Sequence, residues 1–110
     1  LPSAAIEPGA LETVLTTLID NASAAGATGV SISGSATGAT IELVISDDGI
    51  GIAVMDRSRI FEPFFTNKRA EGGTGLGLPI ARALVEGNGG SLVLLDADRG
   101  GRFKISLPQA

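Results

Sequence analysis

The sequence contains no cysteine, histidine, tryptophan or tyrosine. Without cysteine, the chain can form neither disulfides nor a thiolate metal site. Without histidine, it lacks the commonest general base and metal ligand of proteins. Its charged residues are 18% of the chain and sum to a net charge of -4, and phenylalanine is the only aromatic residue. Such a chain has little with which to build a basic, base-stacking surface, so nucleic acid is not an expected partner.

Long apolar runs are also missing, although hydrophobic residues make up 44% of the chain. A membrane span needs about 18 uncharged apolar residues in a row, and neither that pattern nor a signal peptide is present. We therefore expect a soluble, cytoplasmic domain without direct membrane contact, whether or not its parent protein is membrane-anchored. The 110 residues fit a single domain, residues 1–110. Because the chain begins at Leu1 and not at methionine, we expect it to be a fragment of a longer protein.

Apolar periodicity divides the chain into helix, strand, strand, helix, strand, strand. The first helix, within residues 9–27, has an apolar stripe formed by Leu11, Val14, Leu15, Leu18, Ile19 and Ala22. Strands are predicted near residues 29–34 and 39–47, after a short remnant at AAI, and again in SLVLLDA and GRFKISLP. A short helical turn near 55–60 and a polar loop, TNKRAEGGTG, precede the second helix, LGLPIARALVEGN. This order predicts an α+β fold with helices on one face of a mixed sheet.

The stretch ISDDGIGI ends a predicted strand with an acid and two spaced glycines, Asp47, Gly49 and Gly51. One interpretation is simple turn chemistry, since aspartate and glycine end many strands. The other is the floor of a ligand site. A carboxylate at a strand end can accept a hydrogen bond from an exocyclic amine such as that of adenine, while glycines let the backbone approach the base. The motif alone leaves both interpretations open.

Four glycines fall between residues 72 and 77, directly before the second helix. They are either a flexible loop or the approach to a helix N-terminus, whose free amides bind anions such as phosphate. No Gly-Lys-Ser/Thr follows, as a P-loop requires, and no strand precedes, as a dinucleotide fingerprint requires. Asn21, near the end of the first helix, has two readings as well: a surface or capping residue, or a neutral oxygen ligand for Mg²⁺.

Four motifs and their order along the chain resemble those of the ATP-binding catalytic domain of sensor histidine kinases. This domain belongs to the superfamily that includes gyrase-type, heat-shock-chaperone and mismatch-repair ATPases. LIDNA resembles the N box, DDGIGI the first glycine box, FEPFF the phenylalanine box and GTGLGL the second glycine box. The resemblance runs from about Leu11 to Pro108. NASAAGA and FEPFFTNK are similar to the nitrogen-regulation and dicarboxylate-sensor subgroup. The implied fold is a two-layer α/β sandwich of the Bergerat type, with ATP between the helices and a flexible lid.

The resemblance also implies roles for individual residues. Asn21 would coordinate Mg²⁺, Asp47 would accept the adenine amine, and Gly49 and Gly51 would shape the adenine site. The second glycine box would contact phosphate and hinge the lid; its residues are Gly73, Thr74, Gly75, Leu76 and Gly77. No residue of this chain is expected to be the catalytic acid or base.

Other residues near these motifs have two readings. Phe61, Phe64 and Phe65 are expected to pack and so to anchor the lid. Lys68 and Arg69 either meet phosphate or are solvated loop charges. Thr17 and Ala24 stand where many relatives have an asparagine and a basic residue, which puts metal affinity and one phosphate contact in question.

The function implied is transfer of the γ-phosphoryl group of Mg²⁺-ATP to a histidine on a separate dimerisation domain, because this chain has no histidine. A response regulator would act downstream, and the isolated domain would be a monomer. Three alternatives stay open: a serine/threonine kinase of the anti-sigma type, a non-catalytic nucleotide-binding module of the same fold, and a plain α+β interaction domain.

Overall fold

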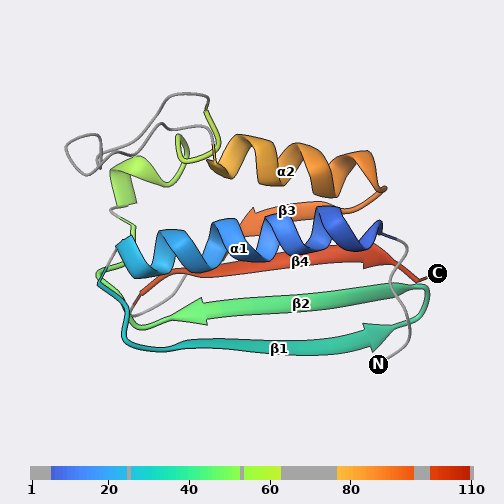
Figure 1. Ribbon diagram of the computed structural model, residues 1–110, viewed down its shortest axis with the longest axis horizontal. Helices are drawn as coiled ribbons and strands as arrows, with labels where there is room; N and C mark the ends of the chain where they lie inside the picture. The colour runs from blue at the N-terminus through green and yellow to red at the C-terminus, as the bar shows by residue number, and fades with distance from the viewer. Residues whose placement is uncertain (1–5, 25, 53, 63–76, 96–99, 110) are drawn as a thin grey trace.

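The computed structural model describes residues 6–24, 26–52, 54–62, 77–95 and 100–109. Two helices lie over one face of a four-stranded sheet (Figure 1). The elements in chain order are α1 (Pro8–Ala24), β1 (Val30–Thr37), β2 (Thr40–Asp47), the 3-10 helix η1 (Val54–Asp56), α2 (Gly77–Gly87), β3 (Ser91–Leu94) and β4 (Arg102–Pro108). The predicted order of elements and the two-layer α+β class are confirmed.

The strands lie in the order β1-β2-β4-β3, and every neighbouring pair of described strands is antiparallel. Where the sequence predicted a mixed sheet, these four strands therefore contain no parallel pair. Of the strand remnant expected at AAI, only Ile6 is described, and it lies outside any strand. β1 runs three residues beyond its predicted end, because β1 and β2 pair up to Thr37 and Thr40 around a two-residue turn. Gly38, the first residue of that turn, has the positive φ of 58° that such hairpins require.

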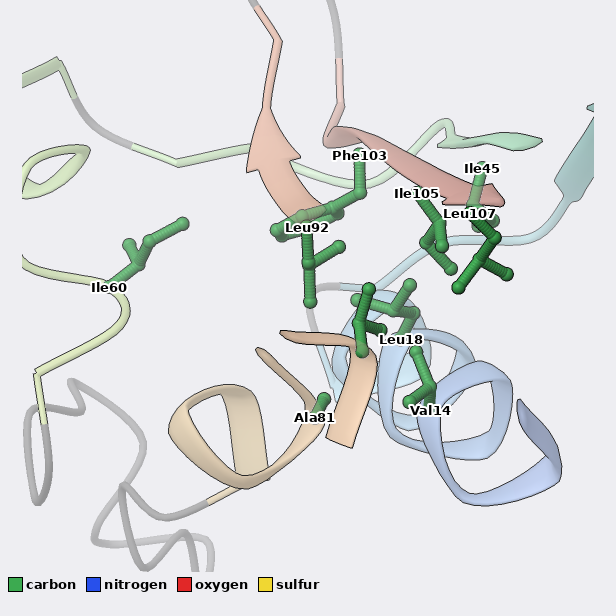
Figure 2. Close-up of a cluster of buried hydrophobic side chains, with 10 residues drawn as sticks. Val14, Leu18, Ile45, Ile60, Ala81, Leu92, Phe103, Ile105 and Leu107 are labelled. Atoms are coloured by element: carbon green, nitrogen blue, oxygen red, sulfur yellow. The ribbon is translucent and has the colours of Figure 1, made fainter. Parts of the chain in front are cut away.

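The core lies between the helices and the sheet (Figure 2). Alternate residues of β2 and β4 face the helices, as the period of a strand dictates. The buried residues from the sheet and the helices include Val14, Leu18, Ile45, Ala81, Val85, Leu92, Phe103, Ile105 and Leu107. One member of the predicted stripe departs from it, because Ile19 is 42% exposed. Ile19 lies about 100° around the helix from the buried Leu18, beyond the width of the buried face.

The predicted site residues that the structure describes, Asn21, Asp47, Gly49, Gly51 and Gly77, lie at one end of the sandwich. α1 and α2 pack against each other in opposite directions, so that the end of α1 and the beginning of α2 lie together, above the end of β2 and the beginning of β4 (Figure 1). In the part of the chain that the structure describes, no helix has the length and apolar character needed to cross a membrane.

Candidate functional site

Asp47 is the last residue of β2 and is half-buried. Its Oδ1 accepts hydrogen bonds from the backbone N–H groups of Gly49, at 2.9 Å, and Gly101, at 3.2 Å. Its own N–H donates to the carbonyl of Gly101 at 2.9 Å. Among the described residues, no donor forms a hydrogen bond with Oδ2 of Asp47. The carboxylate is thus oriented through one oxygen, which leaves the second to accept a hydrogen bond from a ligand.

Glycine is required around this carboxylate because chain segments touch there. A Cβ on Gly51, whose φ is 78°, would lie 2.8 Å from the carbonyl oxygen of Gly100. A Cβ on Gly101 would lie 2.8 Å from Oδ2 of Asp47, and one on Gly100 would collide with the Asp47 carbonyl. Besides Gly49 and Gly51, which the sequence predicted, two more glycines therefore lie close to Asp47: Gly100 and Gly101, directly before β4.

The sequence alone gave Gly100 and Gly101 no part in the predicted site. The available signal was the pair of consecutive glycines directly before an apolar strand. Since β4 pairs with β2, such a pair falls beside the end of β2. The partner strand of β2 could not be read from the sequence, however, so the signal was not sufficient.

Asp48 is a third residue that the sequence did not indicate. Its carboxylate accepts hydrogen bonds from the N–H of Thr28 at 2.7 Å, the hydroxyl of Thr28 at 2.7 Å and the N–H of Gly29 at 3.0 Å. These bonds, with that from Gly29 first, lower the pKa of Asp48 from its usual 3.8 to about 2. The exposed side chain therefore fastens the turn after α1 to the end of β2.

The two helices approach each other closely beside the predicted metal ligand. Asn21 is half-buried and lies in the last turn of α1. One turn earlier, the Thr17 hydroxyl donates to the Thr13 carbonyl at 2.9 Å. A Cβ on Gly77, the first residue of α2, would lie 3.2 Å from the methyl group of Thr17. The N-terminus of α2 is thus held against α1 about one turn from Asn21.

A metal ion at this end would depend on groups beyond the acidic residues. Among the described residues, no group of three His, Cys, Asp or Glu side chains could hold a metal ion. Asn21 offers an uncharged amide oxygen, which suits Mg²⁺ when phosphate and water supply the remaining ligands. The donor set therefore fits a magnesium ion that arrives with a nucleotide.

Several predicted residues lie outside the described ranges. They are Gly73, Thr74, Gly75 and Leu76 of the second glycine box, with Phe64, Phe65, Lys68 and Arg69. Phe61 is described and packs as expected. Its ring meets that of Phe103 edge-on, with centroids 6.4 Å apart and planes at 83°, and the Arg82 guanidinium lies 5.2 Å from its centroid. Anchoring of a lid by these phenylalanines stays a prediction.

Comparison with known proteins gives consistent matches. The family of histidine kinase-, DNA gyrase B-, and HSP90-like ATPases matches residues 6–110. The sensor-like histidine kinase SenX3 of Mycolicibacterium smegmatis is 40% identical over 110 residues, which are 94% of this chain and 29% of SenX3. The chain therefore spans less than a third of the length of that curated relative.

Solved structures agree with the sequence matches. The structure of a mycobacterial sensor histidine kinase, MprB, has a TM-score of 0.78 and 31% identity, over 94% of this chain and 72% of the MprB chain. Full-length ShkA, solved in complex with AMPPNP, has a TM-score of 0.82 and 31% identity, over 100% of this chain and 24% of ShkA. Both similarities extend over most or all of the chain.

Proposed function

Since this chain belongs to the histidine kinase-, DNA gyrase B-, and HSP90-like ATPase family, as an ATP-binding catalytic domain of the sensor histidine kinase type, we propose that it positions Mg²⁺-ATP for transfer of the γ-phosphoryl group to a histidine on a separate domain. The acceptor must lie elsewhere because none of the 110 residues is histidine. A response regulator would receive the phosphoryl group next, and the isolated domain would be a monomer. The nitrogen-regulation-like subgroup stays a prediction.

The orientation of Asp47 carries this proposal. Two backbone N–H groups fix its Oδ1, and Gly100 and Gly101, directly before β4, place no Cβ beside the carboxylate. An adenine base offers an exocyclic amine, which would donate to Oδ2 as a charge-assisted hydrogen bond. Glycine at positions 51 and 100 lets two backbone segments pack against each other beside this carboxylate. The AMPPNP bound to ShkA supports an adenine nucleotide as the ligand of this fold.

The phosphates would lie toward the helices. The first N–H groups of α2 are not bonded within the helix and favour anions. The packing of Gly77 against Thr17 places this helix start close to the last turn of α1, where Asn21 lies. Asn21 would be the protein ligand of Mg²⁺, and the ion, when bound, neutralises charge on the phosphate oxygens. The second glycine box would complete the phosphate contacts.

Phosphoryl transfer depends on positioning and charge stabilisation more than on covalent chemistry by the protein. The residues of this domain would therefore bind and orient the nucleotide, and no side chain in it is assigned as a general acid or base. The isolated domain should bind ATP but hydrolyse it slowly. Sustained hydrolysis by the isolated domain would contradict the proposal and favour a gyrase-like ATPase.

The test is calorimetric titration with AMPPNP, with and without Mg²⁺, on the wild type and on Asp47→Asn. Replacing the carboxylate should weaken binding by about 1.5 to 3 kcal/mol, because the charged acceptor for the amine is lost. Glu12→Gln is the matched control, since Glu12 is exposed in the first part of α1, away from the site. Equal affinities of the wild type and Asp47→Asn would refute the assignment of Asp47.

A second experiment tests the acceptor. The domain is mixed with γ-labelled ATP and the histidine-bearing domain of its full-length protein, and the label is followed after acid treatment. Phosphohistidine is acid-labile, whereas phosphoserine and phosphothreonine are acid-stable. Loss of label in acid is expected; acid-stable label on a partner protein would instead identify a serine/threonine kinase. Nucleotide binding without any transfer would identify a non-catalytic module.

A further inference from the structure

The end of β2 is held from both sides by two consecutive acids. β2 lies between β1 and β4 in the sheet. Asp47 is bonded toward the start of β4 through Gly101, and Asp48 is bonded toward the start of β1 through Thr28 and Gly29. The peptide that carries the adenine-binding acid is therefore fixed between the two neighbouring strands.

The backbone N–H and both carboxylate oxygens of Asp48 take part in these hydrogen bonds. Its Oδ1 accepts from the N–H groups of Thr28 and Gly29, and its Oδ2 accepts from the Thr28 hydroxyl. Its own N–H donates to the Gly29 carbonyl at 3.3 Å. Four hydrogen bonds thus join one exposed residue to a two-residue turn that lies 19 and 20 positions earlier in the chain.

We propose that Asp48 is a positioning residue for adenine recognition, which acts by holding Asp47 and Gly49 in register. This inference rests on the proposed function. Asp48 stands between the acid that would accept the adenine amine and Gly49, whose N–H orients that acid at 2.9 Å. Release of Asp48 from the turn would allow Gly49 to shift and Oδ1 of Asp47 to lose a donor. Recognition sites depend on placement to within about 0.5 Å, so a small shift is sufficient.

A positioning role predicts an effect on one part of the ligand. Because Asp48 would act through the acceptor of the 6-amino group, its loss should reduce the preference for nucleotides that carry this amine. If Asp48 contributed only to folding, its loss would weaken the binding of all nucleotides by the same factor. The informative quantity is therefore a ratio: the dissociation constant of the triphosphate of purine riboside, which lacks the amine, divided by that of ATP.

The experiment measures this ratio by calorimetric titration for the wild type, Asp48→Ala, Asp48→Asn and Glu12→Ala. Asp48→Ala removes all side-chain bonds to the turn and should lower the ratio by about fivefold to tenfold, in the range of measured couplings between neighbouring residues. Asn has the shape of Asp and retains an oxygen for the two N–H donors, so Asp48→Asn should stay within about twofold of the wild type. Glu12→Ala, which removes the same charge far from the site, should leave the ratio unchanged.

Thr28→Val provides a milder variant for the case in which Asp48→Ala is poorly folded. It removes only the hydroxyl bond to Oδ2 and should lower the ratio in the same direction by a smaller factor. If the wild type binds ATP, an unchanged ratio in Asp48→Ala, or in Thr28→Val where Asp48→Ala does not fold, would overturn the inference and leave the proposed function intact. A folded wild type that does not bind ATP would overturn both.

Discussion

Asp47 and Gly101 are joined by two reciprocal hydrogen bonds, although 54 positions separate them in the chain. The Gly101 N–H donates to Oδ1 of Asp47 at 3.2 Å, and the Asp47 N–H donates to the Gly101 carbonyl at 2.9 Å. The pair closes a small ring at the junction of β2 and β4, so that the orientation of the carboxylate is tied to the sheet. A Cβ at position 101 would lie close to Oδ2 of the same carboxylate.

Gly101→Ala should therefore weaken nucleotide binding. The new Cβ would lie 2.8 Å from Oδ2 of Asp47, so the carboxylate must move away from the position that faces the ligand. Crowding of this kind typically costs about 1–3 kcal/mol. Gly87→Ala is the control, because a Cβ there meets nothing within 4 Å. Titration with AMPPNP should show lost affinity for the first variant alone; equal affinities would mean that the site relaxes around the added methyl.

The contact between the helices predicts a coupling between Gly77 and Thr17. Gly77→Ala places a Cβ 3.2 Å from the Thr17 methyl, which has little freedom to move because its hydroxyl is bonded to Thr13. Thr17→Ser removes the methyl but keeps the hydroxyl. In urea unfolding, Gly77→Ala should therefore be less destabilising in the Thr17→Ser background, with a coupling of about 0.5 kcal/mol or more. Simple additivity of the two changes would argue against close helix packing here.

Phe61 should contribute to stability through its ring. It meets Phe103 edge-on, and such pairs contribute about 0.5–1.5 kcal/mol beyond the area that they bury. Phe61→Leu keeps an apolar side chain but loses the ring, so the free energy of unfolding should fall by about 1 kcal/mol. Met55→Leu, in the same segment and 82% exposed, should change it by less than about 0.5 kcal/mol. Equal values for the two variants would show that the aromatic contact is not formed in solution.

The low pKa of Asp48 predicts a specific dependence of stability on acid. Because the pKa is about 2 in the folded protein and 3.8 when unperturbed, the unfolded state binds more protons between these values. The contribution of the charged Asp48 side chain to the free energy of unfolding is thus present in full above about pH 4 and is lost as the pH falls to about 2. The difference in melting temperature between the wild type and Asp48→Asn should narrow over this interval. A difference that stays constant from pH 6 to about pH 2 would contradict the assigned bonds.

The part of the site that the sequence predicted is the part encoded locally. Asp47, Gly49 and Gly51 are close in the chain, so their spacing alone places them at one strand end. The partners of that strand end are distant: Gly101 follows Asp47 by 54 positions, and Thr28 precedes Asp48 by 20. Which strand pairs with which is decided by packing of the whole sheet, and a single sequence does not state it. For the same reason the sequence alone assigned no role to Asp48.

The fold shows the same division between local and distant information. The period of the apolar residues correctly predicted the two helices and four strands, because period is a local property. It did not show where the buried face of α1 ends, and Ile19 was assigned to that face although it is exposed. It also did not show that the four strands pair without a parallel neighbour.

The hydrogen bonds that Asp47 and Asp48 form at the end of β2 have a consequence for amide hydrogen exchange. Turns rich in glycine and aspartate normally exchange their amide protons quickly, since water reaches them. Here the N–H groups of Thr28, Gly29, Asp47, Gly49 and Gly101 all donate within the protein. Exchange requires these bonds to open, so the turns should be protected together with the sheet. The exchange rates of these amides would then report, at the end of β2, whether a bound nucleotide stabilises the hydrogen bonds of both Asp47 and Asp48 or of only one of them.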